Sequence, residues 1–226
     1  MSSSIPKLMH AVLLTSHGGM DKLEYKSDVD VPVPKEDEVL INVKGAGINN
    51  TDINTRIGWY SKSSVENADD GSWSGNPLNF PIIQGADICG NIVAVGSSVD
   101  NKRIGERVIV RTMQTVPENQ KTFSAWTVGS ECNGGFAQFA SIRSSEAFLI
   151  NSDWTDADIA SIPCAYSTAE GLLHRSQVGE EKVFITGASG GVGSAAIQLA
   201  KLRGATVIAQ CSSEKKDGVK KIGADQ

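Results

Sequence analysis

The segment that most constrains the fold of this chain is residues 183–201, Val-Phe-Ile-Thr-Gly-Ala-Ser-Gly-Gly-Val-Gly-Ser-Ala-Ala-Ile-Gln-Leu-Ala-Lys. The short apolar run at residues 183–185 is typical of a buried parallel strand, and glycines follow it at once. Apolar residues then recur with helical spacing from Val192 to Leu199. The segment therefore predicts a strand, a tight turn and a helix, which together open a parallel sheet.

A glycine turn in this context predicts a site for the phosphates of a dinucleotide. Glycines allow a tight turn, let the backbone approach a pyrophosphate and bring the helix close to the strand. The helix N-terminus offers free N–H groups and the positive end of the helix dipole. We expect the cofactor to contact Ala188, Gly190, Gly191, Val192 and Gly193. The alternative is an ordinary glycine-rich turn.

Composition and charge argue against several other classes of protein. The formal net charge of −5 argues against a nucleic-acid-binding or polybasic membrane-binding surface. No apolar run approaches the roughly 18 residues that span a bilayer, and residues 1–7 lack the apolar core of a signal peptide, so we expect a cytoplasmic protein. The four cysteines form no CxxC pair, which favours reduced thiols: Cys89, Cys132, Cys164 and Cys211.

The two ends of the chain differ in pattern. Residues 1–150 predict short strands separated by glycine and proline turns, as in a small barrel. Two polar stretches, residues 61–79 and 112–135, predict a long surface loop and a second lobe. The expected strands of this part are residues 12–14, 39–43, 91–95, 107–110 and 136–140.

From Thr155 onward the pattern becomes helical. Thr155-x-x-Asp158 and Ser167-x-x-Glu170 resemble capping boxes and predict two helix starts. After the glycine turn, we expect a second parallel strand at residues 205–210. The last expected element is a helix at residues 213–222, closed by Gly223.

Five segments resemble, in the same order, motifs of the medium-chain dehydrogenase/reductase superfamily. The resemblance implies an α/β protein in which an N-terminal GroES-like β-barrel domain (1–150) precedes the start of a Rossmann domain, a doubly wound parallel sheet (151–226). It also implies a site between the domains, a small-molecule substrate and a homo-oligomeric full-length form. The segments are Gly45-Ala-Gly-Ile-Asn-Asn-Thr-Asp52, residues 84–96, Gly105-Glu-Arg-Val108, Gly134-Gly-Phe-Ala-Gln138 and Gly187-Ala-Ser-Gly-Gly-Val-Gly193.

The positions that hold catalytic zinc in part of this superfamily carry other residues here. Zinc members use Cys, His and a later ligand, and these positions read Asn49, Ala86 and Cys164. One thiol cannot supply three protein ligands. A structural zinc lobe needs four cysteines, and residues 112–135 contain only Cys132. We therefore expect no metal, and the chain resembles the zinc-independent, quinone-oxidoreductase-like branch. A zinc-type alcohol dehydrogenase relative is the alternative.

Resemblance to that branch implies hydride transfer from a nicotinamide to a quinone, an enone or a related carbonyl compound. Asn49 and Tyr60 are expected to hydrogen-bond the developing oxyanion or relay a proton. Asp52 and Arg56 match positions of the family's cleft, and Thr168 matches a position that contacts the nicotinamide. The alternatives are an i,i+4 salt bridge between Asp52 and Arg56 and plain packing of Tyr60.

The end of the second parallel strand favours NADPH over NADH. NAD enzymes place an acidic residue there, roughly 20 residues beyond the glycines. Here Cys211 comes directly after the expected strand, and Ser212, Ser213 and Lys216 follow it. Hydroxyls and lysines suit a 2′-phosphate. Glu214 is the contrary observation, and we expect it in the first turn of the next helix.

From Glu180 to Gln226 the chain has 47 residues, which suffice for two strands and two helices. A Rossmann domain has six strands, and one βαβ unit takes about 30 residues. We therefore expect an N-terminal fragment of a longer reductase. Two classes of function remain open, an NADPH-dependent reductase encoded over a longer chain and a non-catalytic product that binds a partner or is inactive.

Overall fold

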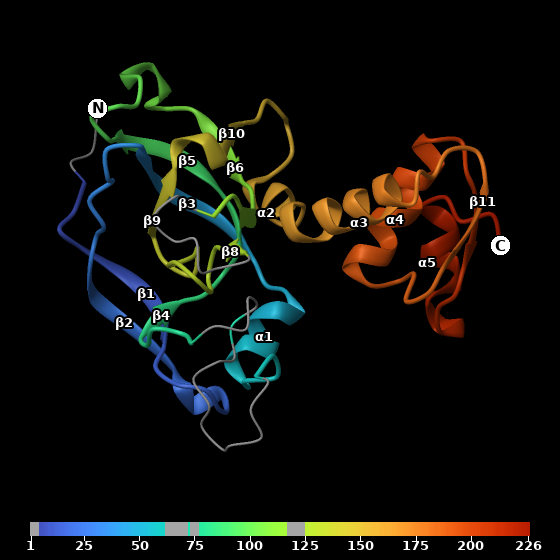
Figure 1. The fold of residues 1–226 in the computed structure, drawn as a ribbon, viewed down its shortest axis with the longest axis horizontal. Helices are drawn as coiled ribbons and strands as arrows, with labels where there is room; N and C mark the ends of the chain where they lie inside the picture. Colours follow the sequence, from blue (N-terminus) through green and yellow to red (C-terminus); the bar gives the residue numbers. More distant parts are fainter. Residues whose placement is uncertain (1–4, 62–71, 73–76, 117–124) are drawn as a thin grey trace. The chain divides into compact units, whose positions relative to one another are not determined.

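The computed structural model describes residues 5–61, 72, 77–116 and 125–226 (Figure 1). Most of the predicted loop at residues 61–79 and the middle of the predicted lobe at 112–135 lie outside this part. The chain divides into two compact units, Met1–Pro163 and Cys164–Gln226. This division falls thirteen residues beyond the expected boundary at residue 150. Each unit is described by itself.

The first unit is built mainly from antiparallel strands. Its helices are α1 (Asn50–Arg56) and α2 (Asp156–Ala160), with 3₁₀ turns η1 (Met20–Lys22), η2 (Asn101–Arg103) and η4 (Ser144–Glu146). Its strands are β1 (Leu8–Leu14), β2 (Leu23–Asp30), β3 (Glu38–Gly47), β4 (Ile82–Ile83), β5 (Asp87–Val95), β6 (Arg107–Val110), β7 (Met113–Gln114), β8 (Trp126–Thr127), β9 (Phe139–Arg143) and β10 (Ala147–Leu149).

Two antiparallel sheets form the half-barrel of this unit. The larger sheet has the order β10-β6-β5-β3-β9, and the smaller has the order β2-β1-β4. An isolated bridge pairs Ala11 of β1 with Ala137, and the N–H of Val12 donates to the carbonyl of Phe136 at 2.8 Å. These contacts fasten the smaller sheet to the segment that leads into β9. The larger sheet is curled (Figure 1).

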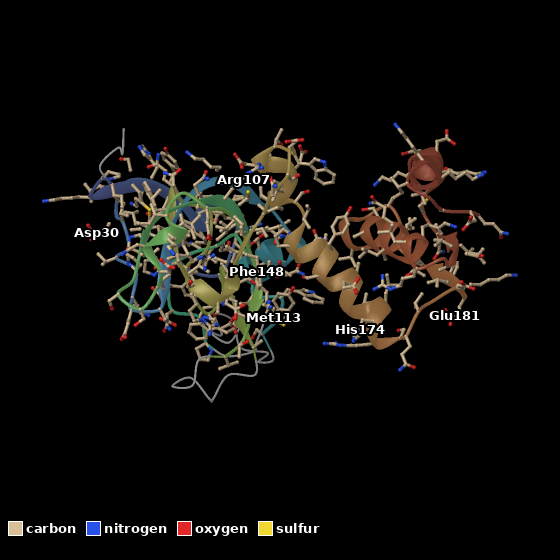
Figure 2. All side chains as sticks on the ribbon, turned by 90° about the horizontal axis from the view of Figure 1, so that it is seen from above. Asp30, Arg107, Met113, Phe148, His174 and Glu181 are labelled. Carbon is tan, nitrogen blue, oxygen red and sulfur yellow. The ribbon has the colours of Figure 1, made fainter. Side chains whose placement is uncertain are left out.

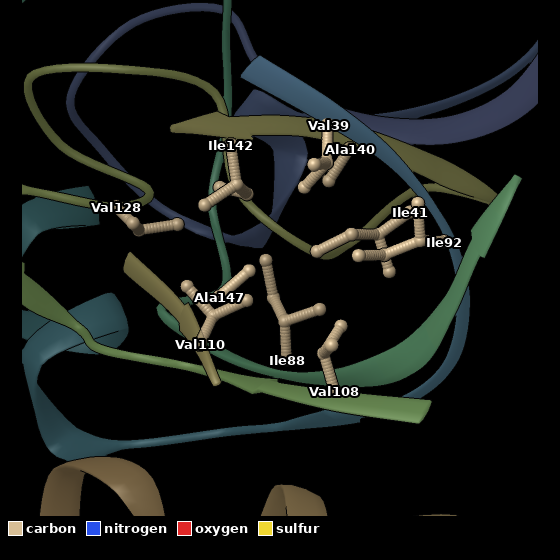
Figure 3. Close-up of a cluster of buried hydrophobic side chains, with 10 residues drawn as sticks. All are labelled: Val39, Ile41, Ile88, Ile92, Val108, Val110, Val128, Ala140, Ile142 and Ala147. Atoms are coloured by element: carbon tan, nitrogen blue, oxygen red, sulfur yellow. The ribbon is translucent and has the colours of Figure 1, made fainter. Parts of the chain in front are cut away.

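Alternating apolar residues of the larger sheet build the main core. Successive side chains of a strand point to opposite faces, so Val39 and Ile41 face inward together. Fully burying each such side chain contributes about 1.5–3 kcal/mol. Figure 3 shows the cluster, whose side chains point toward one another: Val39, Ile41, Ile88, Ile92, Val108, Val110, Val128, Ala140, Ile142 and Ala147.

Arg107, labelled in Figure 2, fixes the segment that leads into α2. Its guanidinium donates to the carbonyls of Ser152 and Trp154, each at 2.7 Å, and its Nε donates to Asp156 Oδ1 at 2.8 Å. Asp156 is the first residue of α2, and a Cβ at Gly45 would lie 2.5 Å from its carbonyl oxygen. This close approach explains a glycine in β3 and places α2 against β3 and β5.

The second unit contains α3 (Pro163–Arg175), β11 (Lys182–Ile185), α4 (Gly191–Leu202), β12 (Thr206–Ala209), η5 (Ser213–Lys215) and α5 (Lys216–Lys221). The two strands are parallel, with Lys182 opposite Thr206. The other edge of β12 pairs with the last residues, since the N–H of Ala209 donates to the carbonyl of Gln226 at 2.9 Å. Apolar residues of α3, α4, β12 and α5 share one core: Leu173, Ile197, Ala200, Val207 and Val219.

Several expected elements are confirmed and others are wrong. Residues 107–110 form β6 as predicted, and Thr155 Oγ1 caps α2 by accepting the N–H of Asp158 at 3.1 Å. The predicted helix start at Ser167 is wrong, because α3 begins at Pro163, whose fixed φ suits a first helical turn. Ser167 Oγ instead donates to the carbonyl of Cys164, one turn back, at 3.4 Å.

Other differences concern the strands. The strand expected at residues 136–140 begins only at Phe139, because the N–H of Phe136 donates to the carbonyl of Gln84 at 2.9 Å. β2 has no counterpart among the expected strands, since most of its residues are exposed and carry no apolar alternation. The helix expected at residues 213–222 is instead the 3₁₀ turn η5 followed by the shorter α5, and Gly223 follows its end with φ +120°, as predicted. Among the described residues, none of the helices has the length and apolar character needed to cross a bilayer.

Candidate functional site

The first candidate site is organised by the N-terminus of α1. Asn49 precedes the helix. Its N–H donates to Asp52 Oδ2 at 2.8 Å, and the N–H of Asp52 donates to the backbone carbonyl of Asn49 at 3.1 Å. Asp52 is buried, and its Oδ1 accepts the N–H of Gly85 at 3.2 Å. Gln84 Nε2 donates to the carbonyl of Asp52 at 2.9 Å. The carboxylate of Asp52 therefore joins α1 to the Gln84-Gly85 segment.

Burial raises the pKa of Asp52, while the N–H groups of Asn49 and Gly85 act in the opposite direction. Arg56, at the other end of α1, donates from Nη1 to the carbonyl of Gly18 at 2.8 Å. The alternative of an i,i+4 salt bridge is thus wrong, because no ion pair joins these two described residues. The structure gives both side chains roles in holding α1 in place.

Glycines surround the Gln84-Gly85 segment closely. Gly85 has φ +95°, a conformation that L side chains rarely adopt. A Cβ at Gly134 would lie 2.3 Å from the carbonyl oxygen of Gly85, and one at Gly129 would lie 2.8 Å from its nitrogen. The N–H of Gly135 donates to the same carbonyl at 2.7 Å. The Gly134-Gly135 motif is therefore explained by backbone packing beneath the site.

Asn49 also contacts an acidic residue that was not among the predicted site residues. Asn49 Nδ2 lies 3.0 Å from Asp87 Oδ2, and Asp87 is 1% exposed. Asp87 opens β5 and stands opposite Gly47 in the β3–β5 register. The motif Gln84-Gly-Ala-Asp87 marks this carboxylate in the sequence, but only the pairing of β3 with β5 brings it to Asn49.

Tyr60 lies just after α1 and is half-buried. Asn54 Nδ2 donates to Tyr60 Oη at 3.3 Å, and the rings of Trp59 and Tyr60 meet edge to face with centroids 5.4 Å apart. The structure thus places four of the predicted residues, Asn49, Asp52, Arg56 and Tyr60, on or beside a single short helix. A role of Tyr60 in proton relay remains a prediction.

The second candidate site is the glycine turn between β11 and α4. Gly187 has φ +60°, and the N–H of Gly190 donates back to its carbonyl at 3.0 Å. Gly190 is the N-cap of α4, and a Cβ there would have only one near contact, at 3.4 Å. A Cβ at Gly193 would lie 2.3 Å from the carbonyl oxygen of Gly187. Gly193 is therefore required for packing, whereas Gly190 borders open space.

The other members of the turn differ in burial. Ala188 is fully buried, and its N–H donates to the carbonyl of Gln210 at 3.0 Å. Gly191 and Val192 form the first turn of α4, where a Cβ at Gly191 would make ordinary contact with Ala165 at 3.6 Å. The turn is thus tied to the end of β12.

A pocket of about 420 Å³ lies at the end of β12. It brings together Ser212, Ser213 and Lys216, which the sequence analysis assigned to cofactor binding. The residues of the glycine turn do not line it, and Thr168 lies exposed on α3. Among the described residues that line the pocket, none carries an acidic side chain: Phe184, Ala209, Gln210, Cys211, Ser212, Ser213, Lys216, Val219, Lys220 and Gln226.

The described residues contain no cluster of three His, Cys, Asp or Glu side chains suited to a metal ion. At the positions where zinc members hold their metal, Asn49 presents an amide nitrogen to Asp87, and Ala86 has no ligand atom. Cys164, the third position, is half-buried near the start of α3. This donor set does not fit catalytic zinc.

Comparison with known proteins defines the class. The family described as the alcohol dehydrogenase GroES-like domain matches residues 35–152, just over half of the chain. The chain belongs to the medium-chain dehydrogenase/reductase superfamily, as a quinone-oxidoreductase-like member. Its two units are the GroES-like half-barrel and part of a Rossmann sheet, as predicted.

Individual relatives match nearly all of the chain. It is 33% identical over 226 residues to the chloroplastic NADPH-dependent alkenal/one oxidoreductase of Arabidopsis thaliana. The aligned region covers 99% of this chain and 53% of that protein. It is 31% identical to human quinone oxidoreductase, and this alignment covers 92% of this chain and 54% of the human protein. A crystal structure of a protein from Sinorhizobium meliloti, assigned as an alcohol dehydrogenase, has 43% identity and a TM-score of 0.87. The match covers 98% of this chain and 62% of that protein's chain. The chain spans about half the length of the curated relatives it matches.

Proposed function

We propose that this chain belongs to an NADPH-dependent, zinc-independent oxidoreductase that transfers hydride to an enone, a quinone or a related carbonyl compound. The observation that carries the proposal is the pocket at the end of β12, where hydroxyls and two lysines gather without an acidic side chain. A carboxylate at this position would bind the ribose hydroxyls of NADH, whereas Ser212, Ser213 and Lys216 suit a phosphate monoester.

The glycine turn supports binding of the rest of the dinucleotide. The N-cap Gly190 leaves space in front of the first N–H groups of α4, which attract the pyrophosphate. Gly191 and Val192 supply backbone N–H groups there, while Ala188 and Gly193 hold the turn against the strand. We keep Thr168 as the proposed nicotinamide contact. NADPH, when bound, supplies the hydride.

The protein's own contribution at the substrate is hydrogen bonding. Asn49 donates an amide hydrogen to the oxygen of the substrate, where negative charge develops during reduction. Tyr60 donates to the same oxygen or passes it a proton. An amide fixed by a buried carboxylate takes the place that a metal ligand has in zinc members, which favours catalysis without zinc.

Relatives support the substrate class. The Arabidopsis protein is named for alkenals and alkenones, and the human protein for quinones. Both substrate types place a carbonyl oxygen in conjugation with the carbon that accepts the hydride, so a single donor such as Asn49 serves both.

Cofactor titrations test the proposal. We expect the chain to bind NADPH at least about tenfold more tightly than NADH, since a hydrogen-bonded charge pair contributes on that order. Lys216→Glu should abolish this preference. Lys182→Glu is the matched control, because Lys182 is exposed on β11 and does not line the pocket. Equal affinity of the unchanged chain for both cofactors would contradict the proposal.

Activity is tested with the chain extended to the length of its relatives. NADPH oxidation should proceed with a 2-alkenal or a quinone and should survive prolonged treatment with a zinc chelator. Loss of activity on chelation, restored by zinc, would favour a zinc-type alcohol dehydrogenase instead. A cytoplasmic location and a homo-oligomeric extended form are further proposals, which cell fractionation and size-exclusion chromatography test.

A further inference from the structure

We propose that Asp87 is a positioning residue, which holds the Asn49 side chain in one orientation so that one amide hydrogen faces the reacting oxygen. The inference rests on the proposed function, because it concerns the residue that would donate to the substrate. It adds a second residue, at the start of β5, to the hydrogen-bonding groups of the site.

The contact with Asp87 defines the orientation of the Asn49 amide. Asn49 Nδ2 donates to Asp87 Oδ2 at 3.0 Å, so the amide turns its nitrogen rather than Oδ1 toward this carboxyl group. The N–H of Asp52 donates to the backbone carbonyl of Asn49 at 3.1 Å, so the orientation of the side-chain amide depends on Asp87. With Nδ2 turned toward Asp87, Oδ1 lies on the other side of the amide. One hydrogen on Nδ2 then remains for a ligand.

The carboxylate is itself held firmly. Asp87 is 1% exposed and lies at the first residue of β5, opposite Gly47 of β3. A Cβ at Gly47 would lie 3.2 Å from Asp87 Oδ2 and 2.6 Å from the carbonyl oxygen of Ala160. The absence of a side chain at Gly47 thus provides the space in which the carboxylate sits. Strand pairing thus fixes Asp87, and the hydrogen bond from the N–H of Asn49 to Asp52 Oδ2 fixes the backbone at Asn49.

Orientation of this amide matters because its two ends have opposite polarity. The hydrogen of Nδ2 stabilises a developing oxyanion, whereas Oδ1 in the same place would repel it. A donor that is already oriented needs no reorganisation as charge develops. Without Asp87, the amide is free to turn, and part of the population presents the wrong end.

Side-chain NMR of the 226-residue chain tests this inference. The Asn49 NH₂ pair, assigned by its loss in Asn49→Ala, should be ordered on the nanosecond timescale in the unchanged chain. Asp87→Leu removes the acceptor at similar volume and should make the pair mobile. Asp87→Asn keeps one acceptor oxygen and should restore most of the order. Cys89→Ala, a buried change two residues along β5, should leave the pair ordered.

A phenolate probe adds a binding readout. Titration with 4-nitrophenolate, whose oxyanion resembles an enolate, should shift the Asn49 NH₂ signals. Asp87→Leu should weaken this binding about tenfold, as expected for loss of one hydrogen bond to a charged group. Cys89→Ala should not. A pair equally ordered in Asp87→Leu, or unchanged phenolate affinity in that variant, would overturn the inference.

The same samples separate this inference from the proposed function. NADPH affinity, measured in parallel, depends on the glycine turn and on the pocket at β12. If the Asp87 variants leave the amide unchanged while NADPH still binds, only the positioning role is lost. If the amide responds as expected and NADPH does not bind, the role of Asp87 stands and the proposed cofactor is wrong.

Discussion

Gly193 lies so close to Gly187 that a Cβ on Gly193 would be 2.3 Å from the Gly187 carbonyl oxygen. The same Cβ would be 2.7 Å from the Cα of Ala188, so backbone atoms block it on two sides. At Gly190, by contrast, the nearest atom is 3.4 Å away. The two glycines of one turn therefore have separable roles, one in packing and one toward a ligand.

This difference predicts unequal effects of alanine. Gly193→Ala should lower the free energy of unfolding by about 1–3 kcal/mol, because the backbone must shift to admit the methyl group. Gly190→Ala should change it by less than about 1 kcal/mol. Urea denaturation followed by circular dichroism measures both. Equal losses in the two variants would contradict the assignment of roles.

A charge at the open glycine should block the cofactor. Asp is a favoured N-cap residue, so Gly190→Asp should fold normally. Its carboxylate would nevertheless face the pyrophosphate, and we expect NADPH affinity to fall at least about a hundredfold, as like-charge repulsion of a few kcal/mol implies. Isothermal titration calorimetry measures the affinity, with Gly190→Ala as the uncharged control. Retained affinity in Gly190→Asp would show that the phosphates bind elsewhere.

The sequence was most informative where a local pattern determines local structure. The alternation of Val39 and Ile41 predicted β3, and Thr155-x-x-Asp158 predicted the start of α2. Both features are read along one stretch of chain. The glycine turn was predictable for the same reason, since strand, turn and helix are consecutive.

Relationships between distant residues were not predictable in this way. Asp87 meets Asn49 only through the register of β3 and β5, which shifts at two irregular positions. Likewise, Asp52 receives the N–H of Gly85, 33 residues further along the chain, instead of pairing with the nearby Arg56. Single-sequence spacing suggests helix neighbours, but tertiary packing decided the partners.

The burial of Asp52 predicts a pH dependence of stability. The pKa of Asp52 is raised in the folded state, so the folded protein binds this proton more tightly than the unfolded chain, whose aspartates titrate near about 3.9. The contribution of Asp52 to stability should therefore fall as the pH rises from about 3.9 through the folded-state pKa, and then level off.

Comparison with Asp52→Asn isolates this contribution. The difference in unfolding free energy, unchanged chain minus variant, should decrease over that pH range. Urea titrations at closely spaced pH values measure it. The N–H of Val207 and Lys201 lower the pKa of the exposed Asp225. The effect of Asp225 on stability cancels in the difference, because both proteins contain this residue. A difference that increases with pH would mean that the hydrogen bonds from Asn49 and Gly85 outweigh burial.

Two cysteines of the first unit should resist alkylation. Burial, with Asp156 nearby, raises the pKa of Cys89 to about 11, and burial raises that of Cys132 to about 12. Since the thiolate is the reactive form, only about one Cys89 in a thousand is reactive at pH 8. Mass spectrometry after iodoacetamide treatment should show both residues unmodified in the folded chain and modified in urea. The rate at Cys89 should rise about tenfold per pH unit, as the thiolate fraction requires, while the protein stays folded. Rapid labelling of Cys89 at pH 8 would show instead that β5 opens readily and would locate the least stable part of the half-barrel beside Asp87.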